Sequence, residues 1–450
     1  MTGRWDFDVA VVGGGPGGSA AAAALARRGH AVVQIEKTTF PRFHIGESQL
    51  PWLNGVLAEI GATEAVAAAG FVQKWGAAFG AGDADIERYA DFARAPEVPE
   101  PQTVQVPRER FDQVLLDHAA ACGATVKQHC QARRAKFDPD GVDLTYETAD
   151  GGEATLRVGA VVDASGRYGF LARTFGQRNS DPELRNIAVH RQYENVPRRD
   201  GRRAGDIRIF TRADGGWFWL IPISDRVMSV GVVLPQTAYR AVAAGRPEDT
   251  LDAVTRATPN VAALLANANA VSEARFEADY SYLHSLQAGD RFVLVGDAGA
   301  FLDPIFSTGV LLAMQSGVEA AAAISAGLRD GDLSARRFRA FERQVVRRYR
   351  HFRRLVVGFY DPAFRDLFLS PSSRLGLFEA VLSTLAGNWR PSWSIRLRLW
   401  LFFWLVRIQR HVALAPRHLE ATSAATGRPF LEPAGDPSSP RLAETGDGRT

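Results

Sequence analysis

The chain has 450 residues, is 46% hydrophobic and 23% charged, and carries a formal net charge of +3, values typical of a folded protein with two or three layers or subdomains. The small net charge, without zinc-finger or RNA-binding spacings, argues against a nucleic-acid partner. Two cysteines, Cys122 and Cys130, are too few for a disulfide framework, and no basic and apolar leader opens the chain. We therefore expect a cytoplasmic protein without a signal peptide.

The first elements predict one β-α-β unit. Residues 8–12 form a short apolar strand, residues 19–28 an alanine-rich helix that Gly29 would end, and residues 31–35 a second strand. A second β-α-β unit does not follow it directly in the sequence.

The loop inside this unit carries the glycine pattern GxGxxG at Gly13, Gly15 and Gly18. The first glycine permits the tight turn, the second lets a pyrophosphate approach the backbone, and the third lets the helix pack on the strand. Glu36 ends the second strand, where a carboxylate can accept hydrogen bonds from ribose hydroxyls. A purely structural glycine turn is the alternative, but the complete register predicts a dinucleotide.

Further elements follow in chain order. Residues 104–110 predict a strand edge, residues 111–120 an amphipathic helix, and residues 158–163 a buried strand that Ala164-Ser-Gly ends. From about 186 to 278, alternating apolar and polar residues predict an antiparallel sheet with one covered face.

The last third predicts mostly helices. A continuously apolar strand at 292–295 precedes a helix from Gly309 to about Leu328, and an arginine-rich helix covers 335–355. The tail from about 433 is rich in Pro, Gly, Ser and Asp and is expected to be disordered.

Two later motifs favour FAD over NAD. Residues 291–297, a strand that ends in Gly-Asp, resemble the second signature of FAD enzymes of the glutathione-reductase type, in which Asp297 would bind the ribityl chain. Asp163 begins a segment that resembles the middle motif of the same superfamily. No second GxGxxG follows a strand, so a separate NAD(P)H domain is not expected.

These segments define the expected fold class, which is α/β. We expect a glutathione-reductase-type FAD-binding domain with an inserted antiparallel β-sheet substrate domain and a helical C-terminal region. The FAD-binding domain is discontinuous because its motifs flank the inserted sheet. Its expected residues are 1–80, 104–180 and 279–330; the substrate domain takes 81–103 and 181–278, the helical region 331–432, and the disordered tail 433–450.

Four segments together resemble one family, the flavin-dependent halogenases. They are Phe40–Pro51 with its Gly-Glu-Ser, Lys74 in Gln-Lys-Trp-Gly, Trp217-Phe-Trp-Leu-Ile-Pro222, and Phe301–Gly309. The resemblance runs in order from about residue 5 to 315. The WxWxIP segment and the lysine are its more specific parts.

The resemblance implies an FADH2- and O2-dependent halogenase of secondary metabolism, such as antibiotic biosynthesis. A bound chloride or bromide would become hypohalous acid at the flavin, and this oxidant would travel to Lys74 beside the substrate. An ammonium polarises the oxidant, whereas a neutral amine forms a haloamine. Trp217 and Trp219, sharing one direction on a strand, would keep the substrate from the flavin. The alternatives are a surface lysine and ordinary sheet-core tryptophans.

The resemblance also implies the remaining site residues. The backbone N–H groups of Thr308 and Gly309, at a helix start, would bind the halide. Val310 would lie against the isoalloxazine ring. No metal site is expected. The full set expected to bind the cofactor is Gly13, Gly15, Gly18, Glu36, Lys37, Arg42, Gly46, Glu47, Ser48, Arg108, Asp163, Asp297, Pro304 and Val310.

One position departs from the tryptophan halogenases, which have a glutamate directly before Ser-Thr-Gly. Here that residue is Phe306. The pattern formed by Phe301, Pro304, Ser307 and Gly309 is more similar to halogenases of phenols, pyrroles and carrier-bound substrates. We therefore expect an electron-rich aromatic ring or activated carbon as substrate, free or tethered to a carrier protein, and do not favour free tryptophan.

Three partners are considered. A separate NAD(P)H-dependent flavin reductase would supply FADH2. The arginines of the 335–355 helix would receive an acidic acyl- or peptidyl-carrier protein, although a solvated helix face is the more common explanation. The apolar run Leu399–Val406 is too short to span a bilayer; it suits a buried helix closing a pocket, peripheral membrane contact, or an apolar substrate or partner. The arginines of the 335–355 helix named above are Arg336, Arg337, Arg339, Arg343, Arg347, Arg348, Arg350, Arg353 and Arg354.

Rival functions remain open. An FAD-dependent aromatic monooxygenase would transfer oxygen directly to a substrate at the flavin, which the two indoles should prevent. A lipid-reducing flavoenzyme of the geranylgeranyl-reductase type would use the apolar C-terminus for a prenyl chain but leaves Lys74 unexplained. A flavin-binding protein without turnover is a more distant possibility. Dependence of the product mass on the halide separates them.

Overall fold

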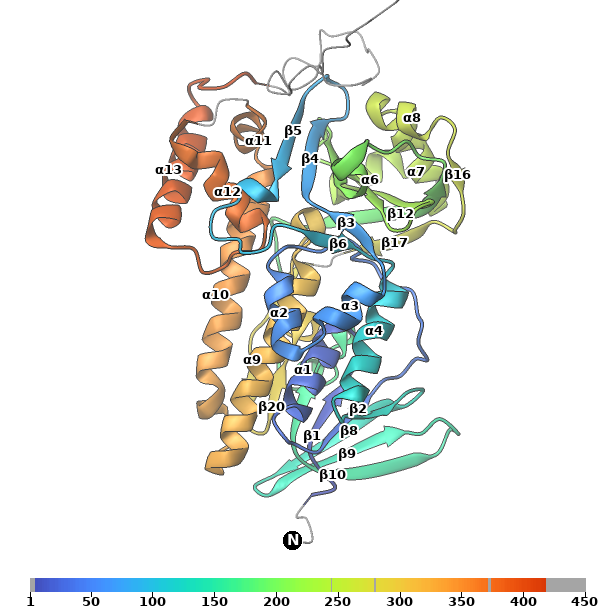
Figure 1. Cartoon of the computed structure of the whole chain (residues 1–450), viewed down its shortest axis with the longest axis vertical. Coiled ribbons are helices and arrows are strands. Elements are labelled where there is room, and N and C mark those ends of the chain that lie inside the picture. The colour runs from blue at the N-terminus through green and yellow to red at the C-terminus, as the bar shows by residue number, and fades with distance from the viewer. Residues whose placement is uncertain (1–4, 244, 279–280, 371–373, 418–450) are drawn as a thin grey trace, which may run out of the picture.

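The computed structural model describes residues 5–243, 245–278, 281–370 and 374–417. Two large sheets form its body, with helices packed on both, as Figure 1 shows. The disordered tail expected from residue 433 lies outside the described residues.

The first sheet is the parallel one that the glycine motif predicts. β1 (Phe7–Val12) lies between β10 (Glu153–Asp163) and β2 (Val32–Ile35), and all three run parallel. β20 (Phe292–Leu294) and β7 (Thr125–Lys127) extend it in parallel on either side. The side chains of β1 from Val9 onward are buried, as apolar strands of a covered parallel sheet require. β8 (Gln131–Asp138), β9 (Gly141–Glu147) and β19 (Ala288–Gly289) add antiparallel strands at its edges.

Three helices pack around this sheet: α1 (Pro16–Ala26), α4 (Arg108–Ala121) and α9 (Gly309–Asp330). α1 begins three residues earlier than predicted, because Pro16 suits the first turn of a helix. α4 also begins earlier, at Arg108, so the predicted strand edge at 104–110 is wrong beyond β6 (Thr103–Gln105). Smaller elements complete this part: α2 (Leu53–Ile60), α3 (Thr63–Ala68), α5 (Ala172–Phe175), β3 (Val72–Lys74), β11 (Arg178–Ser180), β18 (Tyr282–His284) and β21 (Ala300–Phe301).

α9 is long and apolar enough to cross a membrane by length and composition. It packs on α1 so closely that a Cβ at Gly317 would collide with the backbone of Gly17. Half of the side chains in its apolar window are buried. This burial identifies α9 as a core helix that packs with α1 on the first sheet.

The second sheet differs from its prediction in two ways. It is mostly antiparallel, but β4 (Gly76–Ala81) pairs with β13 (Ile207–Thr211) in parallel, so β4 crosses the boundary expected at residue 80. Both of its faces are covered, not one. Its other strands are β5 (Glu87–Asp91), β12 (Asn186–Glu194), β14 (Trp217–Pro222), β15 (Val227–Pro235), β16 (Asn269–Ala270) and β17 (Arg275–Ala278).

β14 explains why both faces must be apolar. Phe218 and Leu220 point into a core shared with α6 (Gln236–Val242), α7 (Pro247–Arg256) and α8 (Pro259–Leu265). Trp217 and Trp219 point the other way, into a core shared with the C-terminal helices. A strand covered on both sides carries a continuous apolar run. In Figure 1 the two groups of helices lie on opposite sides of β4 and β5.

The C-terminal region consists of α10 (Ala335–Tyr360), α11 (Pro362–Leu369), α12 (Leu377–Leu385) and α13 (Trp393–Gln409). α10 runs beside α9 along the first sheet, and the other three cluster at its end (Figure 1). α13 is not the buried helix that was one reading of its apolar run. Ile395, Leu399 and Phe402 are buried, but Trp400 and Trp404 are exposed.

Candidate active site

A cavity of about 450 Å³ lies between the two sheets, at the carboxyl ends of the parallel strands. Gly13 has a φ of +114°, and a Cβ there would collide with the carbonyl oxygen of Ala164. A Cβ at Gly18 would collide with the carbonyl oxygen of Gly13. The loop thus needs glycine at both positions, the first for its turn and the second for helix packing.

Most of the expected cofactor residues meet in this cavity. The ones that line it are Gly13, Gly15, Glu36, Lys37, Arg42, Gly46, Glu47, Ser48, Arg108, Asp297, Pro304 and Val310, together with Trp217, Trp219 and Gly309. Gly18, Asp163, Thr308 and Lys74 lie behind its wall. The cavity also has liners that the prediction missed, such as Arg167 and Tyr168 on the loop after β10.

Glu36 and Asp163 show how differently two expected cofactor carboxylates are used. Glu36 lines the cavity and accepts hydrogen bonds from the backbone N–H of Gly14 (2.6 Å) and Thr38 (2.8 Å). Asp163 does not line the cavity. Its buried carboxylate accepts hydrogen bonds from Ser165 and from the backbone N–H of Leu171, which fixes the loop after β10. Asp163 thus supports the loop beside the cavity, and its contact with the cofactor stays a prediction.

The residues present fit FAD. A Cβ at Gly46, whose φ is +107°, would lie 2.9 Å from a guanidinium nitrogen of Arg108, so bare backbone faces the cavity there. Asp297 sits at its wall, and burial raises the pKa of this carboxyl to about 6 while Arg108 opposes the shift. Arg108 itself is fixed by two hydrogen bonds to Asp112.

Lys74, the last residue of β3, is 1% exposed. Its Nζ donates hydrogen bonds to Ser48 Oγ (2.8 Å) and to the carbonyl oxygen of Gln49 (2.7 Å). The Nζ also lies 5.2 Å from the ring centroid of Phe92. Burial lowers the pKa of Lys74 from 10.5 to about 7, with Asp206 opposing the shift. The amine is thus outside bulk water, and its neutral form is far easier to reach near pH 7 than that of an exposed lysine.

Ser48 joins Lys74 to the flavin cavity, because its residue lines the cavity while its hydroxyl accepts the hydrogen bond from the amine. Glu47, directly before it, is also buried and lines the cavity. Burial raises the pKa of Glu47 to about 7, and a hydrogen bond with Ser229 opposes the shift. The amine that Ser48 contacts and the carboxyl of the residue directly before Ser48 therefore both have a pKa shifted to about 7.

The two indoles form part of the cavity wall. Their ring centroids are 5.8 Å apart, and both side chains are buried. Trp219 donates from Nε1 to Ser229 Oγ (3.2 Å), and a Cβ at Gly231 would collide with its ring. β14 thus places two large aromatic rings between the flavin cavity and the helical core behind them.

Trp217 is held by a chain of hydrogen bonds that the sequence did not predict. Its Nε1 donates to Tyr360 Oη (2.9 Å), and Tyr360 donates to Asp303 Oδ2 (2.8 Å). Asn186 donates to the same carboxylate oxygen at 2.8 Å. Burial raises the pKa of Asp303 to about 6, and these donors oppose the shift. The end of α10 is thereby tied to the indole wall.

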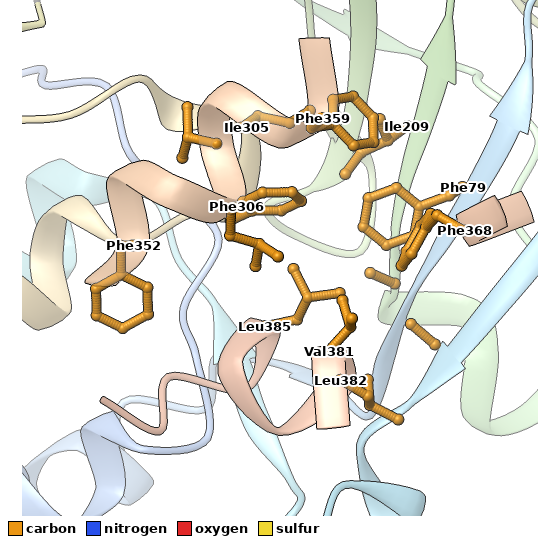
Figure 2. Close-up of a cluster of buried hydrophobic side chains, with 14 of the residues drawn as sticks. Phe79, Ile209, Ile305, Phe306, Phe352, Phe359, Phe368, Val381, Leu382 and Leu385 are labelled. Atoms are coloured by element: carbon orange, nitrogen blue, oxygen red, sulfur yellow. The ribbon is translucent and has the colours of Figure 1, made fainter. Parts of the chain in front are cut away.

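Phe306, the residue that replaces glutamate, lies in an aromatic cluster (Figure 2). Its ring centroid is 5.4 Å from that of Phe359 and 6.4 Å from that of Phe79. Phe368 packs edge-on against Phe79 at 5.0 Å. α10, α11 and α12 thus close this side with apolar groups. Phe92, beside Lys74, belongs to the same core.

The start of α9 offers backbone N–H groups beside the cavity. Ser307, with a φ of +55°, turns the chain into the helix, and Ser307 and Gly309 line the cavity. Thr308 is the N-cap residue, and its buried side chain gives the helix no capping hydrogen bond. The first N–H groups of a helix have no intrahelical acceptor and favour an anion.

Comparisons with known proteins agree with this site. Residues 6–348 match the family described as FAD binding domain. A flavin-dependent halogenase of Armillaria mellea, armH3, is 36% identical over 380 residues, which are 78% of this chain and 74% of the relative. A 1H-pyrrole-2-carbonyl-[peptidyl-carrier protein] chlorinase of Pseudomonas fluorescens is 33% identical over 397 residues, 83% and 88% of the two chains.

Two further matches extend the comparison. A tryptophan 2-halogenase of Chondromyces crocatus is 34% identical over 364 residues, 78% of this chain and 67% of the relative. The structure of the myxobacterial chondrochloren halogenase matches with a TM-score of 0.75 and 32% identity, covering 89% of this chain and 97% of its own. The mixed α/β fold, an FAD cavity with its paired indoles, and these relatives place the chain in the flavin-dependent halogenases, which use FAD with O2 and a halide.

Proposed function

We propose that this halogenase makes hypohalous acid in the flavin cavity and passes it to Lys74, which halogenates an electron-rich aromatic or activated-carbon substrate of secondary metabolism. Reduced FAD, when bound, supplies with O2 and halide the oxidant for this reaction. The site would contribute separation: the oxidant arises in the cavity that the two indoles line and is used at Lys74, which does not line that cavity.

The contact between Ser48 and Lys74 carries the proposal. The Ser48 hydroxyl is 2.8 Å from Nζ, and the same residue lines the flavin cavity. A small oxidant that leaves the cavity at Ser48 therefore meets the amine next. Because the pKa of Lys74 is lowered to about 7, both the ammonium, which hydrogen-bonds the oxidant, and the amine, which can be halogenated, are present at neutral pH.

The remaining roles are assigned by position. Thr308 and Gly309 would hold the halide through the N–H groups at the start of α9. Trp217 and Trp219 would exclude an organic substrate from the cavity. The cofactor residues would belong to a glutathione-reductase-type FAD-binding domain at 1–80, 104–180 and 279–330, except that β4 at Gly76–Ala81 belongs to the second sheet. The sheet at 81–103 and 181–278 and the helices at 331–432 would form the rest of the substrate site.

The substrate proposal rests on Phe306 and its neighbours. At position 306 the site has an apolar ring, packed against Phe359 and Phe79, in place of the glutamate of the tryptophan halogenases. We therefore expect a phenol or pyrrole, whose rings are already electron-rich.

A carrier protein is proposed as one form in which the substrate arrives. Arg337, Arg348 and Arg353 are used in ion pairs within the protein. The other six arginines of α10 repeat every three or four residues, which places them on one exposed face. None of the six forms an ion pair within the described part of the chain. They are Arg336, Arg339, Arg343, Arg347, Arg350 and Arg354. An acidic carrier surface is complementary to this face.

A separate NAD(P)H-dependent flavin reductase is proposed as the source of FADH2, and the cytoplasm as the location. Peripheral membrane contact through the C-terminal apolar segment is also a proposal.

The test supplies the enzyme with FADH2 from a reductase, O2, and either chloride or bromide. A phenol, a pyrrole on a carrier protein, and free tryptophan are offered as substrates, and products are identified by mass spectrometry. We expect a product whose mass follows the halide. A hydroxylated product that forms equally without halide would overturn the proposal.

A further inference from the structure

The outer face of α13 is apolar although no part of the described chain covers it. The described chain has eleven exposed large hydrophobic side chains, and six of them lie between residues 393 and 414. Four belong to α13: Trp393 is 76% exposed, Leu397 54%, Trp400 57% and Trp404 46%. The other two, Val412 and Leu414, follow the helix.

These four residues form a single stripe. Their spacing of four, three and four residues places them on one side of the helix, over roughly 16 Å of its length. The buried stripe that includes Ile395 and Phe402 lies on the opposite side and packs into the protein core. A helix that is apolar on both sides is normally covered on both sides, by protein or by lipid. α13 lies at the outer edge of the molecule in Figure 1.

The charged residues in the sequence around the stripe are all arginine. Residues 380–417 contain arginines but no Asp, Glu or Lys. Arg396 and Arg407 are exposed beside the stripe, and within the described residues neither forms an ion pair. Arg410 also carries positive charge, although it pairs with Asp361 at 2.7 Å. A surface that covers α13 must therefore accommodate the indole rings and carry negative charge that attracts the arginines.

We propose that the outer face of α13 docks on the surface of an anionic lipid bilayer. Indole rings prefer the boundary between headgroups and acyl chains, where the ring is buried and the N–H stays hydrated. Arginines beside them attract anionic headgroups. A helix lying in the interface plane uses this combination of residues.

Other occupants fit less well. A second copy of the chain, placed face to face, would bring the arginines of two α13 helices together. The C-terminal segment 418–450 has one Phe and three Leu but no Val, Ile, Met, Trp or Tyr, so it has few large apolar side chains to cover three indoles. A carrier protein is complementary to the arginine face of α10, which bears no exposed tryptophan.

A groove of about 890 Å³ lies between α10 and α13. Arg350 and Arg354 line it from α10, and Trp400, Trp404 and Arg407 line it from α13. Arg354 lies over the ring of Phe403 at 4.0 Å, which joins the two helices. Asp181 and Asp361 also line the groove but pair with Arg353 and Arg410, which leaves Arg350, Arg354 and Arg407 as the cations next to the tryptophans.

The experiment uses the full chain and vesicles of phosphatidylcholine alone or of roughly 3:1 phosphatidylcholine and phosphatidylglycerol. Co-sedimentation measures binding, and tryptophan emission reports the environment of the indoles. We expect binding to the anionic vesicles with a blue shift. The double variant Trp400→Gln and Trp404→Gln should lose at least about tenfold in binding and most of the shift.

The matched control changes two exposed hydrophobic side chains far from α13 in the sequence, Val271→Gln directly after β16 and Phe276→Gln on β17, and should bind like the wild type. Absence of binding to anionic vesicles, or equal binding by both double variants, would overturn the proposal. So would a shift from dimer to monomer caused by the tryptophan changes, or a loss of carrier-protein binding, because each identifies another occupant. None of these outcomes depends on halogenation, so the test stands apart from the proposed reaction.

Discussion

The hydroxyl of Ser48 lies 2.8 Å from the amine of Lys74 and connects it to the wall of the flavin cavity. Ser48 is contributed by the loop after β2, and Lys74 by β3. The pairing of Ser48 with Gln105 as an isolated bridge, and of β3 with β6, brings the two segments together. The amine is therefore placed by backbone pairing, not by a flexible surface side chain.

Removing this hydroxyl should separate oxidant formation from its use. We expect Ser48→Ala to lower the halogenated product formed per FADH2 oxidised by about tenfold, because a hydrogen bond to a buried amine contributes on the order of 1–3 kcal/mol to its placement. Product and FADH2 are measured together, with FAD affinity as a check on the cavity. Ser48→Thr keeps a hydroxyl and should retain most of the yield. An unchanged yield in the alanine variant would remove Ser48 from the route.

The low pKa of Lys74 should appear in stability as well. In the unfolded chain its pKa is near 10.5, and in the folded chain about 7. Between these values the unfolded state binds a proton that the folded state does not, so this group makes the free energy of unfolding rise with pH, by at most about 1.4 kcal/mol per pH unit. Lys74→Met lacks this slope.

Urea unfolding at several pH values from 6 to 9 measures the effect as the difference between wild type and Lys74→Met. The methionine variant should have its largest advantage at or below pH 7 and lose it as the pH rises. Titration of Glu47 is common to both proteins and cancels. A difference that does not vary with pH would show that Lys74 has an ordinary pKa.

Phe306 tests the apolar character of the helical side of the site. Phe306→Glu would bury a carboxylate among Phe79, Phe359 and their neighbours, at a cost of several kcal/mol. We expect a protein that fails to fold or melts far below the wild type in thermal unfolding. Phe306→Leu, which keeps the position apolar, should fold. A Phe306→Glu variant of normal stability would mean that water or a cation reaches this position.

The arginine face of α10 makes a separate prediction about partners. Arg347→Glu together with Arg350→Glu should weaken binding of an acidic carrier protein at least about tenfold, and more at low salt. Arg256→Glu, at the end of α7, is the control and should bind normally. Isothermal calorimetry with the carrier measures both. Unchanged affinity in the double variant would leave the face as a solvated helix surface.

The sequence predicted the parts of the molecule that local patterns dictate. The short spacing of Gly13 and Gly18 indicated the loop, although the contact that excludes a side chain at Gly13 comes from Ala164, after β10. The continuous apolar run of β14 marked the indoles. In the same way the turn at Ser307 and the start of α9 follow from local residues.

Other features depend on segments that meet only in three dimensions. Tyr360 has no local signal that places its hydroxyl between Trp217 and Asp303. The helix at 393–409 shows its apolar residues in the sequence. Which of them face the core depends on where α11 and α12 pack, and this is why its exposed stripe was not foreseen.

The most direct test of delivery through Lys74 compares two variants, Lys74→Met and Lys136→Met. Lys136 is an exposed lysine on β8 and serves as the control. FADH2 oxidation and halogenated product are measured in the same reaction, with free hypohalous acid trapped by a scavenger. The account predicts that Lys74→Met still oxidises FADH2 and releases oxidant to the scavenger but forms almost no product, whereas Lys136→Met behaves as the wild type. Wild-type product yield from Lys74→Met would contradict it.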